Sequence, residues 1–396
     1  MKAWNTVRID QLGRVVTGKT PSSERPEEFG DAYPFITPSD IPATRKYVEV
    51  ERHLSERGME SHRRIQLPKK SVCVVCIGAT IGKVCMVERL SISNQQINSI
   101  IPTKDKSDAD FVYYLSTTLR DSLVAFAGGS ATPIINKSAF SSIKLLVPEY
   151  AEQRKIAAIL SAYDEQIENN QRRIALPKKM AEEIYREWFV RMRFPGHEKV
   201  KFIKGVPAGW RDQKFGQFCQ LQRGYDLPDA NVEPGPYPVM ASTSIKVYHS
   251  QYKVEPPVIT TGRSGSLGEV LIVHTKAWPL NTALYVKQFF GNSVFLVYYT
   301  LKNMRLENFN AGAGVPSLNR NHLNGIPIIV PNKELQDRFD DVVSKFHSQA
   351  EMLKKSNEIL SATRDKLLPR LISGKLSVEN LDIQFPPGMV EPIHEI

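Results

Sequence analysis

An internal duplication with a constant offset constrains this chain more than any other feature of its sequence. The stretch GSATPIINKSAF begins at residue 129, and GAGVPSLNRNHL begins 183 residues later, at residue 312. Four matched pairs keep the same offset: Pro133 and Pro316, Asn136 and Asn319, Pro148 and Pro331, and Gln153 and Gln336. A period of this length is too long for a solenoid repeat and fits one domain followed by a helix. The chain is therefore predicted to contain two domains of the same plan.

Each copy shows the same internal order. Short runs with β propensity come first, such as SVCVVCIG in the first copy and PPVITTG in the second. Other matching runs are ATIGKVCMV at 79–87 and GSLGEVLIV at 265–273, SISNQQINSIIP at 91–102 and AWPLNTALYVK at 277–287, and DFVYYLSTTL at 110–119 and VFLVYYTLKN at 294–303. Their glycine turns are interpreted as strand connections, because a phosphate loop needs a following helix and lysine. A proline then closes each copy and a long helix begins. We call residues 1–148 head 1 and residues 197–331 head 2.

Apolar residues alternate at spacings of four and three along both helices, which predicts a coiled-coil seam. In the first helix the seam is Ile156, Leu160, Tyr163, Ile167, Asn170, Ile174, Pro177, Ala181, Ile184 and Trp188. In the second helix it is Phe339, Val343, Phe346, Ala350, Leu353, Asn357, Leu360, Arg364 and Leu367. At 1.5 Å per residue the first seam spans about 50 Å.

The two helices are predicted to pack antiparallel, with paired residue numbers that add to 527. In this register Trp188 meets Phe339, and the two central asparagines, Asn170 and Asn357, meet each other. A buried amide can pair with another and so fix the register of the two helices. The alternative is two independent amphipathic helices, each packed on its own head.

Two residues are expected to disturb the regular coil. Pro177 should kink or break the first helix at Leu176, because proline lacks the amide hydrogen that the helix needs. Arg364 occupies a seam position opposite Tyr163, where its long side chain can extend to solvent or stack on the ring.

The excess of basic residues is concentrated in the two heads. Head 1 has 20 Lys and Arg against 15 Asp and Glu, and head 2 has 14 against 8. Residues 149–196 have 9 against 8, and residues 332–396 have 9 against 11. Two separate basic bodies suggest two contacts with a polyanion, with nucleic acid as the first candidate.

The rest of the composition is typical of a soluble protein, for which we expect a cytoplasmic location. Hydrophobic residues make up 41% and charged residues 24% of the chain. The sequence has no run of 18 apolar residues, and its N-terminus MKAWNTVRID has no apolar signal core. Cys73, Cys76 and Cys85 could supply three zinc ligands, but a fourth ligand in a matching knuckle is missing. With Cys219, they are interpreted as buried core residues.

Several short motifs, taken in order, resemble one family. They are TGKTPSS at 17–23, FITPSDI at 35–41, SNQQI at 93–97, TPIINKSAF and VPEYAEQRKIAAIL within 132–160, and YREWFVRMRFPGH at 185–197. With the duplication, they resemble the specificity subunit of type I restriction–modification enzymes over nearly the whole chain. The second copy departs from the pattern, since PNKELQDRF lacks the Glu-Gln pair. This blurs one motif but not the architecture.

The resemblance implies an α+β fold in which two pseudo-symmetric target-recognition domains are separated by two long helices that form an antiparallel coiled coil. The expected parts are a first target-recognition domain at 1–148, a first conserved helix at 149–196, a second target-recognition domain at 197–331, a second conserved helix at 332–376 and a tail at 377–396. The tail is expected either to be disordered or to lie along head 1.

The resemblance further implies that each domain reads one half of a split double-stranded DNA site. The helices would set the spacing and dock two methyltransferase (modification) subunits, and endonuclease (restriction) subunits would join through these partners. The alternatives are a two-headed protein scaffold without DNA specificity, and a stand-alone nuclease or methylase with an unrecognised site.

The chain itself is expected not to be an enzyme. It lacks the FxGxG and [DN]-P-P-[YF] motifs of an adenine methyltransferase and the GxxxxGK[ST] loop of an ATPase. No catalytic residue and no metal ligand is therefore assigned. S-adenosylmethionine, ATP and Mg²⁺ are expected in the partner subunits.

Reading base edges requires Arg, Lys, Asn, Gln, Ser or Thr side chains, which selects polar loop residues as candidates. In head 1 they are Lys19, Thr20, Ser22, Ser23, Arg25, Ser39, Arg45, Lys46, Arg63, Arg64, Lys69 and Lys70. In head 2 they are Arg223, Tyr225, Ser242, Thr243, Ser244, Lys246, Tyr248, Arg263 and Ser264. The alternative for each is a solvated surface residue. Because these loops differ between the heads, the two half-sites are expected to differ.

Outside the seam, the helices carry further apolar residues, which are typical of a surface where another helix packs. They are Ile159, Tyr185, Phe189, Val342, Met352 and Ile359. We therefore expect one methyltransferase subunit on each side of the coil.

Overall fold

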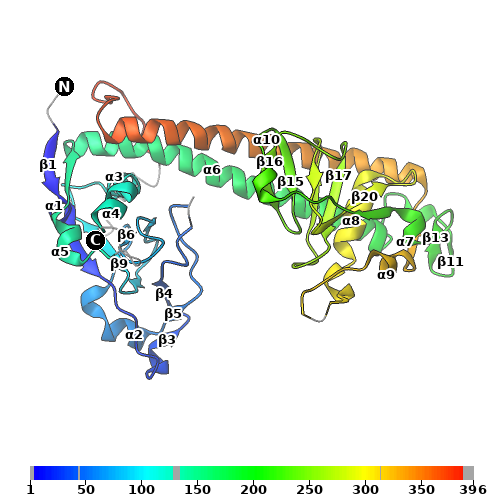
Figure 1. Ribbon diagram of the computed structural model, residues 1–396, viewed down its shortest axis with the longest axis horizontal. Helices are drawn as coiled ribbons and strands as arrows, with labels where there is room; N and C mark the ends of the chain where they lie inside the picture. The colour runs from blue at the N-terminus through cyan, green and yellow to red at the C-terminus, as the bar shows by residue number, and fades with distance from the viewer. Residues whose placement is uncertain (1–3, 43–44, 128–133, 313, 387–396) are drawn as a thin grey trace. The chain divides into compact units, whose positions relative to one another are not determined.

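The structure, a computed structural model, describes residues 4–42, 45–127, 134–312 and 314–386 (Figure 1). The chain forms two compact units, which are described separately. Unit 1 comprises Met1–Asn170 and Lys355–Ile396, and unit 2 comprises Gln171–Lys354. Each unit thus contains one head and a stretch of each long helix.

The elements of head 1 follow in chain order. They are β1 (Asn5–Arg8), α1 (Ile9–Leu12), β2 (Gly13–Thr17), the 3₁₀ turn η1 (Pro26–Glu28), β3 (Phe29–Gly30), β4 (Tyr33–Ile36), β5 (His53–Leu54), α2 (Glu56–Ser61), the 3₁₀ turn η2 (Arg63–Ile65), β6 (Val72–Val75), β7 (Val84–Met86), β8 (Ile92–Ser93), β9 (Ile97–Pro102), α3 (Ala109–Thr117), α4 (Arg120–Phe126), α5 (Lys137–Ser142) and β10 (Lys144–Val147). The long helix α6 (Tyr150–Tyr185) follows, and a π-helical turn η3 (Arg186–Val190) continues it.

Head 2 follows a similar order, although its described residues include no counterpart of α2. Its elements are η4 (His197–Lys199), β11 (Phe202–Ile203), β12 (Val206–Pro207), β13 (Arg211–Lys214), α7 (Phe215–Phe218), β14 (Gln220–Arg223), η5 (Asp229–Asn231), β15 (Tyr237–Met240), β16 (Ile245–His249), β17 (Val258–Gly262), β18 (Val270–Val273), β19 (Trp278–Pro279), β20 (Ala283–Gln288), α8 (Val294–Asn303), η6 (Leu306–Phe309), α9 (Arg320–Asn324) and β21 (Pro327–Val330). The second long helix, α10 (Lys333–Ile372), follows it.

Both heads are built on the same four-stranded antiparallel sheet. The strand order is β2-β9-β6-β7 in head 1 and β14-β20-β17-β18 in head 2. A two-stranded ladder joins the start of each head to its end, β1 with β10 and β13 with β21. In a further sheet, β4 pairs parallel with β8, and β15 pairs parallel with β19. The α+β class and the duplicated plan predicted from the sequence are confirmed.

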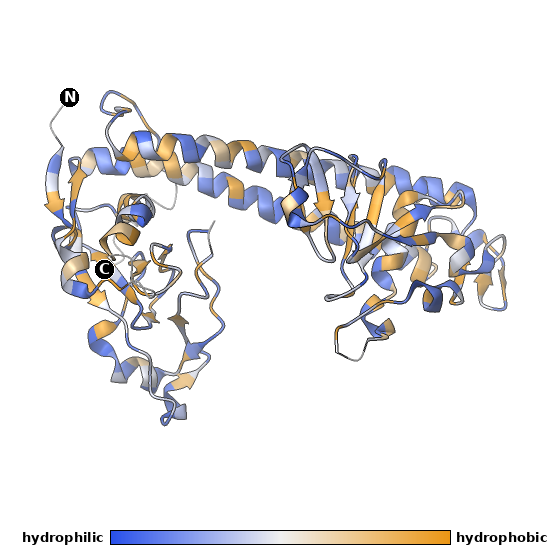
Figure 2. Cartoon of the chain, viewed as in Figure 1, coloured by the Kyte–Doolittle hydropathy of each residue, from blue (hydrophilic) through white to orange (hydrophobic). Residues whose placement is uncertain are grey.

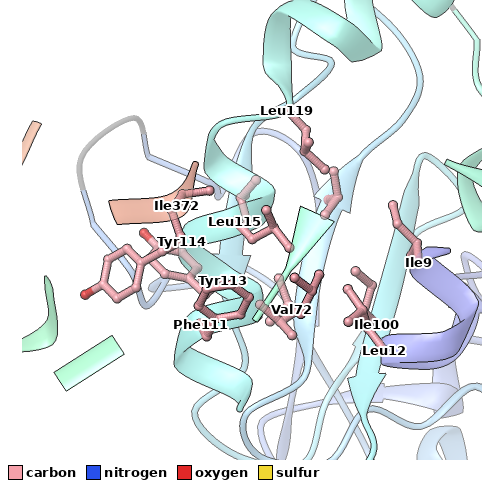
Figure 3. Packing of buried hydrophobic residues seen from close by; sticks show 14 of the residues in the cluster. Ile9, Leu12, Val72, Ile100, Phe111, Tyr113, Tyr114, Leu115, Leu119 and Ile372 are labelled. Carbon is pink, nitrogen blue, oxygen red and sulfur yellow. The ribbon is translucent and has the colours of Figure 1, made fainter. Parts of the chain in front are cut away.

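The core of unit 1 lies between the four-stranded sheet and the helices (Figure 3). Ile9 of α1, Val72 of β6 and Phe111 of α3 have no measurable exposure, and Ile372 brings α10 into the same cluster. Asp108 positions α3, because its side chain caps the first turn by accepting from the Phe111 amide at 2.9 Å. The equivalent cluster of unit 2 joins α7, α8, β20 and the aromatic residues of α6 and α10.

The matched glutamines of the repeat tie each long helix to its head. Gln153 accepts from the Asp108 amide at 3.0 Å and donates to the carbonyl of the closing proline at 3.0 Å. Gln336 accepts from the Ser293 amide at 2.9 Å and donates to the other closing proline at 2.9 Å. Both glutamines are buried. The 183-residue repeat therefore preserves one hydrogen-bonded junction in both units.

Within unit 1, α6 and α10 run antiparallel. Asn170 Nδ2 donates to Asn357 Oδ1 at 2.8 Å, and Asn357 Nδ2 donates to the Ile167 carbonyl at 3.2 Å. Arg364, at the seam position predicted to lie opposite Tyr163, forms an ion pair with the neighbouring Asp164 of α6. The Asp164 carboxylate, one residue after Tyr163, binds the Arg364 guanidinium because it neutralises the positive charge.

Within unit 2, the same two helices meet through aromatic residues. The rings of Trp188 and Phe339 lie 5.9 Å apart, and Ala181 and Val343 are buried in the same cluster.

The other predicted seam residues, taken from both units, are buried or half-buried. Ile156 and Leu160 are buried, and the half-buried ones are Ile167, Ile174, Ile184, Phe346, Leu353, Leu360 and Leu367. Figure 2 shows hydrophobic and hydrophilic residues alternating along α6 and α10.

Pro177 does not break the first helix, contrary to our expectation. The helix runs without interruption from Tyr150 to Tyr185. Pro177 is buried, so the packing of the turns around it outweighs the one hydrogen bond that a proline removes.

The described part of the tail lies on unit 1. Val378 is buried in the core cluster, and Lys155 Nζ donates to the carbonyls of Glu379 and Leu381, both at 2.8 Å. The Arg154 guanidinium lies over the Phe385 ring at 4.5 Å. Residues 387–396 lie outside the described residues.

Two further observations concern the whole described chain. All four cysteines are buried free thiols, and the described residues contain no group of His, Cys, Asp and Glu that could hold a metal ion. Nor do they include a helix of sufficient length and apolar character to cross a membrane.

Candidate nucleic-acid interface

In each head, three loops meet at one end of the strands of the four-stranded sheet. In head 1, β2 and β6 both pair antiparallel with β9, so the ends of β2 and β6 lie beside the start of β9. In head 2, β14 and β17 end beside the start of β20 in the same way. We call these segments the strand-end loops. They comprise residues 18–20, 76–78 and 94–96 in head 1 and residues 224–226, 263–265 and 280–282 in head 2.

Main-chain hydrogen bonds hold the strand-end loops in the same frame in both heads. The amide of Lys19 donates to the Ser93 carbonyl at 2.9 Å, and the amide of Tyr225 donates to the Pro279 carbonyl at 2.8 Å. The glycine before each donor, Gly18 or Gly224, allows this close approach. A Cβ at either position would lie 2.2 Å from a carbonyl oxygen of the facing loop.

The repeated motif fastens the third loop to this frame. The Ile135 amide donates to the Cys76 carbonyl at 2.9 Å, and the Leu318 amide donates to the Arg263 carbonyl at 2.8 Å. The asparagine that follows caps the next short helix: Asn136 accepts from the Ala139 amide, and Asn319 accepts from the Asn321 amide. The repeated element thus closes the loop end of each sheet. Pro133, which belongs to the same motif, lies outside the described residues.

Seven predicted DNA-contacting residues lie in or beside the strand-end loops. They are Lys19 and Thr20 in head 1 and Arg223, Tyr225, Ser242, Arg263 and Ser264 in head 2. The Ser242 hydroxyl donates to the carbonyls of Ser264 and Thr282, both at 2.9 Å, which attaches the turn after β15 to this end of the sheet. Thr243 and Ser244 belong to the same turn, and Ser39 lies in the equivalent turn after β4.

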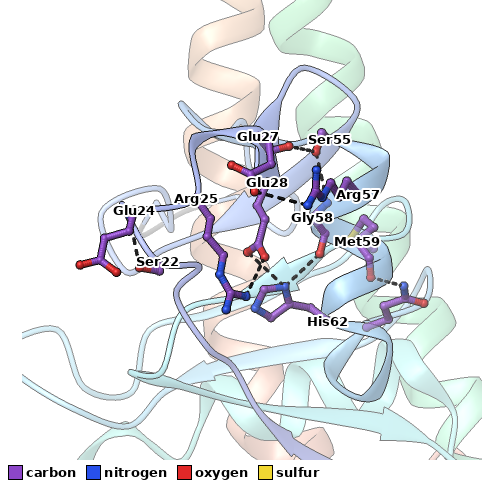
Figure 4. A network of polar contacts seen from close by, with 11 residues as sticks. Ser22, Glu24, Arg25, Glu27, Glu28, Ser55, Arg57, Gly58, Met59 and His62 are labelled. Atoms are coloured by element: carbon purple, nitrogen blue, oxygen red, sulfur yellow. Dashed lines mark hydrogen bonds and ion pairs between the residues drawn. The ribbon is translucent and has the colours of Figure 1, made fainter.

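Other predicted residues surround α2, away from the strand ends. Arg25 contacts the Glu28 carboxylate at 3.3 Å, and His62 Nδ1 lies 3.9 Å from the same carboxylate (Figure 4). Glu28 is 3% exposed, so Arg25 holds a buried charge. Ser22 and Ser23 lead into η1, Arg63 and Arg64 form η2, and Arg63 pairs with Glu60 at 3.3 Å.

The side chain of Lys46 lies mostly inside unit 1 and pairs with a carboxylate there. This corrects its inclusion among the DNA contacts. Its side chain is 11% exposed and forms an ion pair with Asp110. Lys70 adds a second contact to Asp110 at 3.4 Å. Burial raises the pKa of the Asp110 carboxyl, but the two ammonium groups outweigh that effect and lower it. Desolvated charges in such a pair serve the fold.

The remaining candidates lie outside the segments that make up the strand-end loops. Lys69 and Lys70 precede β6 and so lie at its opposite end. Arg45 lies 3.8 Å from Glu49. Lys246, which pairs with Asp229, and Tyr248, which is exposed, lie on β16.

Several polar side chains of the strand-end loops were not among the candidates, and three of them are Gln95, Asp226 and Asn281. Thr20 donates to Gln95 at 2.5 Å in head 1, and Asn281 donates to Asp226 in head 2. Arg223 contacts Asp226 at 3.2 Å and so joins the second pair. Gln95 belongs to the SNQQI segment, and aligning this segment with its counterpart in the second copy could have found Gln95 and Asn281 together.

The helix residues predicted to contact partners divide into three groups by exposure. Met352 is 65% and Ile359 is 67% exposed. Tyr185 is buried inside unit 2, where its ring stacks on Tyr299 at a centroid distance of 5.8 Å. This corrects its assignment to the partner surface. The others are partly buried: Ile159 and Phe189 pack on the cores of their units, and Val342 is half-buried.

Two heads of one α+β plan, each followed by a long helix, define a duplicated domain family. The family model described as type I restriction modification DNA specificity domain matches residues 1–178 and 207–361. The chain belongs to this family.

Relatives of known name support the assignment. The chain is 27% identical to the type I restriction enzyme MjaIX specificity subunit of Methanocaldococcus jannaschii, over 96% of this chain and 95% of that protein. It is 34% identical to the type I restriction enzyme HindI specificity subunit of Haemophilus influenzae, over 46% of this chain and 42% of that protein. The crystal structure of a type I restriction-modification S subunit from M. genitalium has the same fold, with a TM-score of 0.60 and 18% identity over 93% of this chain and 96% of that chain.

Proposed function

We propose that this chain supplies DNA specificity to a type I restriction–modification complex and catalyses no reaction itself. Each head reads one half of a split DNA site through its strand-end loops. The supporting observation is the recurrence of one loop frame in two basic heads, with different side chains on it. Since those side chains select the bases, the two half-sites differ and the whole site is asymmetric.

In this proposal the two long helices provide the spacer and the docking surface. Exposed apolar residues such as Met352 and Ile359 would be buried against methyltransferase subunits, one on each side of the helix pair. Restriction subunits would join through these partners. S-adenosylmethionine, ATP and Mg²⁺ would bind to the partners, and the complex would act in the cytoplasm, where the chromosomal DNA lies.

The test is to co-express the chain with its methyltransferase subunit and to map DNA methylation across the genome by long-read sequencing. We expect a single split, asymmetric motif, and exchange of residues 1–148 for another head should change only one half of it. Assembly of the complex without any methylated motif would overturn the proposal in favour of a protein scaffold. Methylation or cleavage by the purified chain alone would contradict its non-catalytic role.

A further inference from the structure

A carboxamide side chain occupies the same position in the strand-end loops of both heads. Gln95 lies two residues after β8 and two residues before β9. Asn281 lies two residues after β19 and two residues before β20. The frame around them is also shared, because the amide of Gly18 donates to Ile97 and that of Gly224 donates to Ala283, at 3.1 and 3.0 Å.

Each carboxamide is held by the residue two positions after the glycine of the facing loop. That residue is Thr20 in head 1 and Asp226 in head 2. Gln95 is exposed and Asn281 is half-buried, so both can be reached from solvent while one end of each amide is fixed. A side chain that is oriented before binding loses less conformational entropy when it contacts a ligand.

The partner decides which end of the amide remains for a ligand. A carboxylate only accepts, so Asp226 requires the amino group of Asn281 and leaves the Asn281 carbonyl oxygen as the acceptor. Arg223 donates to both oxygens of Asp226, at 3.2 and 3.4 Å, which holds this orientation. In head 1 the Thr20 hydroxyl donates to Gln95 Oε1, which leaves the amino group as the donor.

We propose that Gln95 and Asn281 are equivalent specificity-determining residues that each read one base in the major groove. This inference rests on the proposed function. Asn281 presents an acceptor and so selects a base with an exocyclic amino group, cytosine or adenine. Gln95 presents donors and so selects a base with an acceptor at its edge, such as the O6 or N7 of guanine.

The experiment compares three variants of the full chain, each assembled with its methyltransferase subunit and assayed by genome-wide methylation mapping. In Asn281→Ala, discrimination at one position of one half-site should fall by roughly tenfold, and that position should be cytosine or adenine in the parent motif. Gln95→Ala should relax one position in the other half, so each variant is the matched control for the other. Asp226→Asn retains size and polarity but no longer fixes the amide, and it should relax the same position as Asn281→Ala.

The outcomes separate this inference from the proposed function. A parent complex without a methylated motif would overturn both. A parent motif that all three variants reproduce unchanged would overturn only the roles of Gln95 and Asn281. If Asn281→Ala prevents assembly, Asp226→Asn decides: an unchanged motif refutes the inference, and relaxation at one cytosine or adenine supports it.

Discussion

The Asn170–Asn357 pair gives a sharp test of how α6 and α10 are aligned within unit 1. Replacing Asn357 with leucine removes the oxygen that accepts from Asn170 Nδ2 at 2.8 Å. Asn170 is 1% exposed, so water cannot replace the lost partner, and the unpaired donor costs about 1–3 kcal/mol. For a unit of about 200 residues, each kcal/mol lowers the melting temperature by about 2–4 °C. Calorimetry of the full chain should therefore show the transition of unit 1 lowered by several degrees.

A double-mutant cycle distinguishes a lost pair from a general loss of packing. Replacing both asparagines with leucine removes the donor together with its acceptor, so the double variant should recover most of the stability lost in either single variant. The coupling energy should be about 1–2 kcal/mol. Asn169→Leu, at the neighbouring exposed position of the same helix, should change stability by less than about 0.5 kcal/mol. Additive single variants would show that the two amides do not interact and would refute the alignment.

Three further predictions follow from contacts elsewhere in the chain. Met352→Glu with Ile359→Glu should abolish co-purification with the methyltransferase subunit while leaving the unfolding transition unchanged, since both side chains are exposed. Lys46→Met should destabilise unit 1 by about 3–5 kcal/mol, because it leaves Asp110 buried with a weaker partner. Lys46→Met should not change the salt dependence of DNA binding. Lys19→Ala, which we expect to remove a phosphate contact, should reduce the slope of log K against log salt concentration by about 0.9. Burial, together with His274 and Lys178, lowers the pKa of His347 to about 4. The stability that this neutral imidazole contributes to unit 2 should therefore be fully present above about pH 6.5 and be lost as the pH falls towards 4. His347→Gln, which keeps an acceptor for Tyr299, should flatten this dependence in unfolding curves measured from pH 8 to 4.

The sequence predicted those features that repeat or that follow a regular period. Residues 183 apart must satisfy the same backbone geometry, and Gln153 and Gln336 therefore make the same junction. Likewise, a heptad period leaves few registers open, and the two asparagines meet in the register that was predicted. Pro177 was expected to kink or break the first helix and does not break it, because the packing that surrounds the helix outweighs a local rule about proline.

The strand-end loops could not be derived in this way. Thr20 and Gln95, like Asp226 and Asn281, come from segments far apart in the sequence, so aligning the two copies could match Gln95 with Asn281 but could not show which residue contacts each of them. Residue type alone favoured cations, and it therefore selected Lys46, whose charge is used inside the fold. Tyr185 was assigned to the wrong face of its helix for a related reason, since apolar residues next to a seam can also pack on the head of the same unit.

One tyrosine of each head forms a hydrogen bond with the following long helix, and the two bonds show that duplication retains the position of a contact more strictly than its chemistry. The Tyr114 hydroxyl donates to Asp164 at 2.5 Å, and the Tyr299 hydroxyl pairs with His347 Nε2 at 2.9 Å. Asp164 and His347 are themselves 183 residues apart. In unit 1 the acceptor is a carboxylate that pairs with Arg364, and in unit 2 it is an imidazole whose lowered pKa keeps it uncharged. The strand-end loops follow the same rule, with recurring main-chain bonds and different side-chain pairs. Substitutions on such a frame can change what one head reads while the backbone of that head is kept.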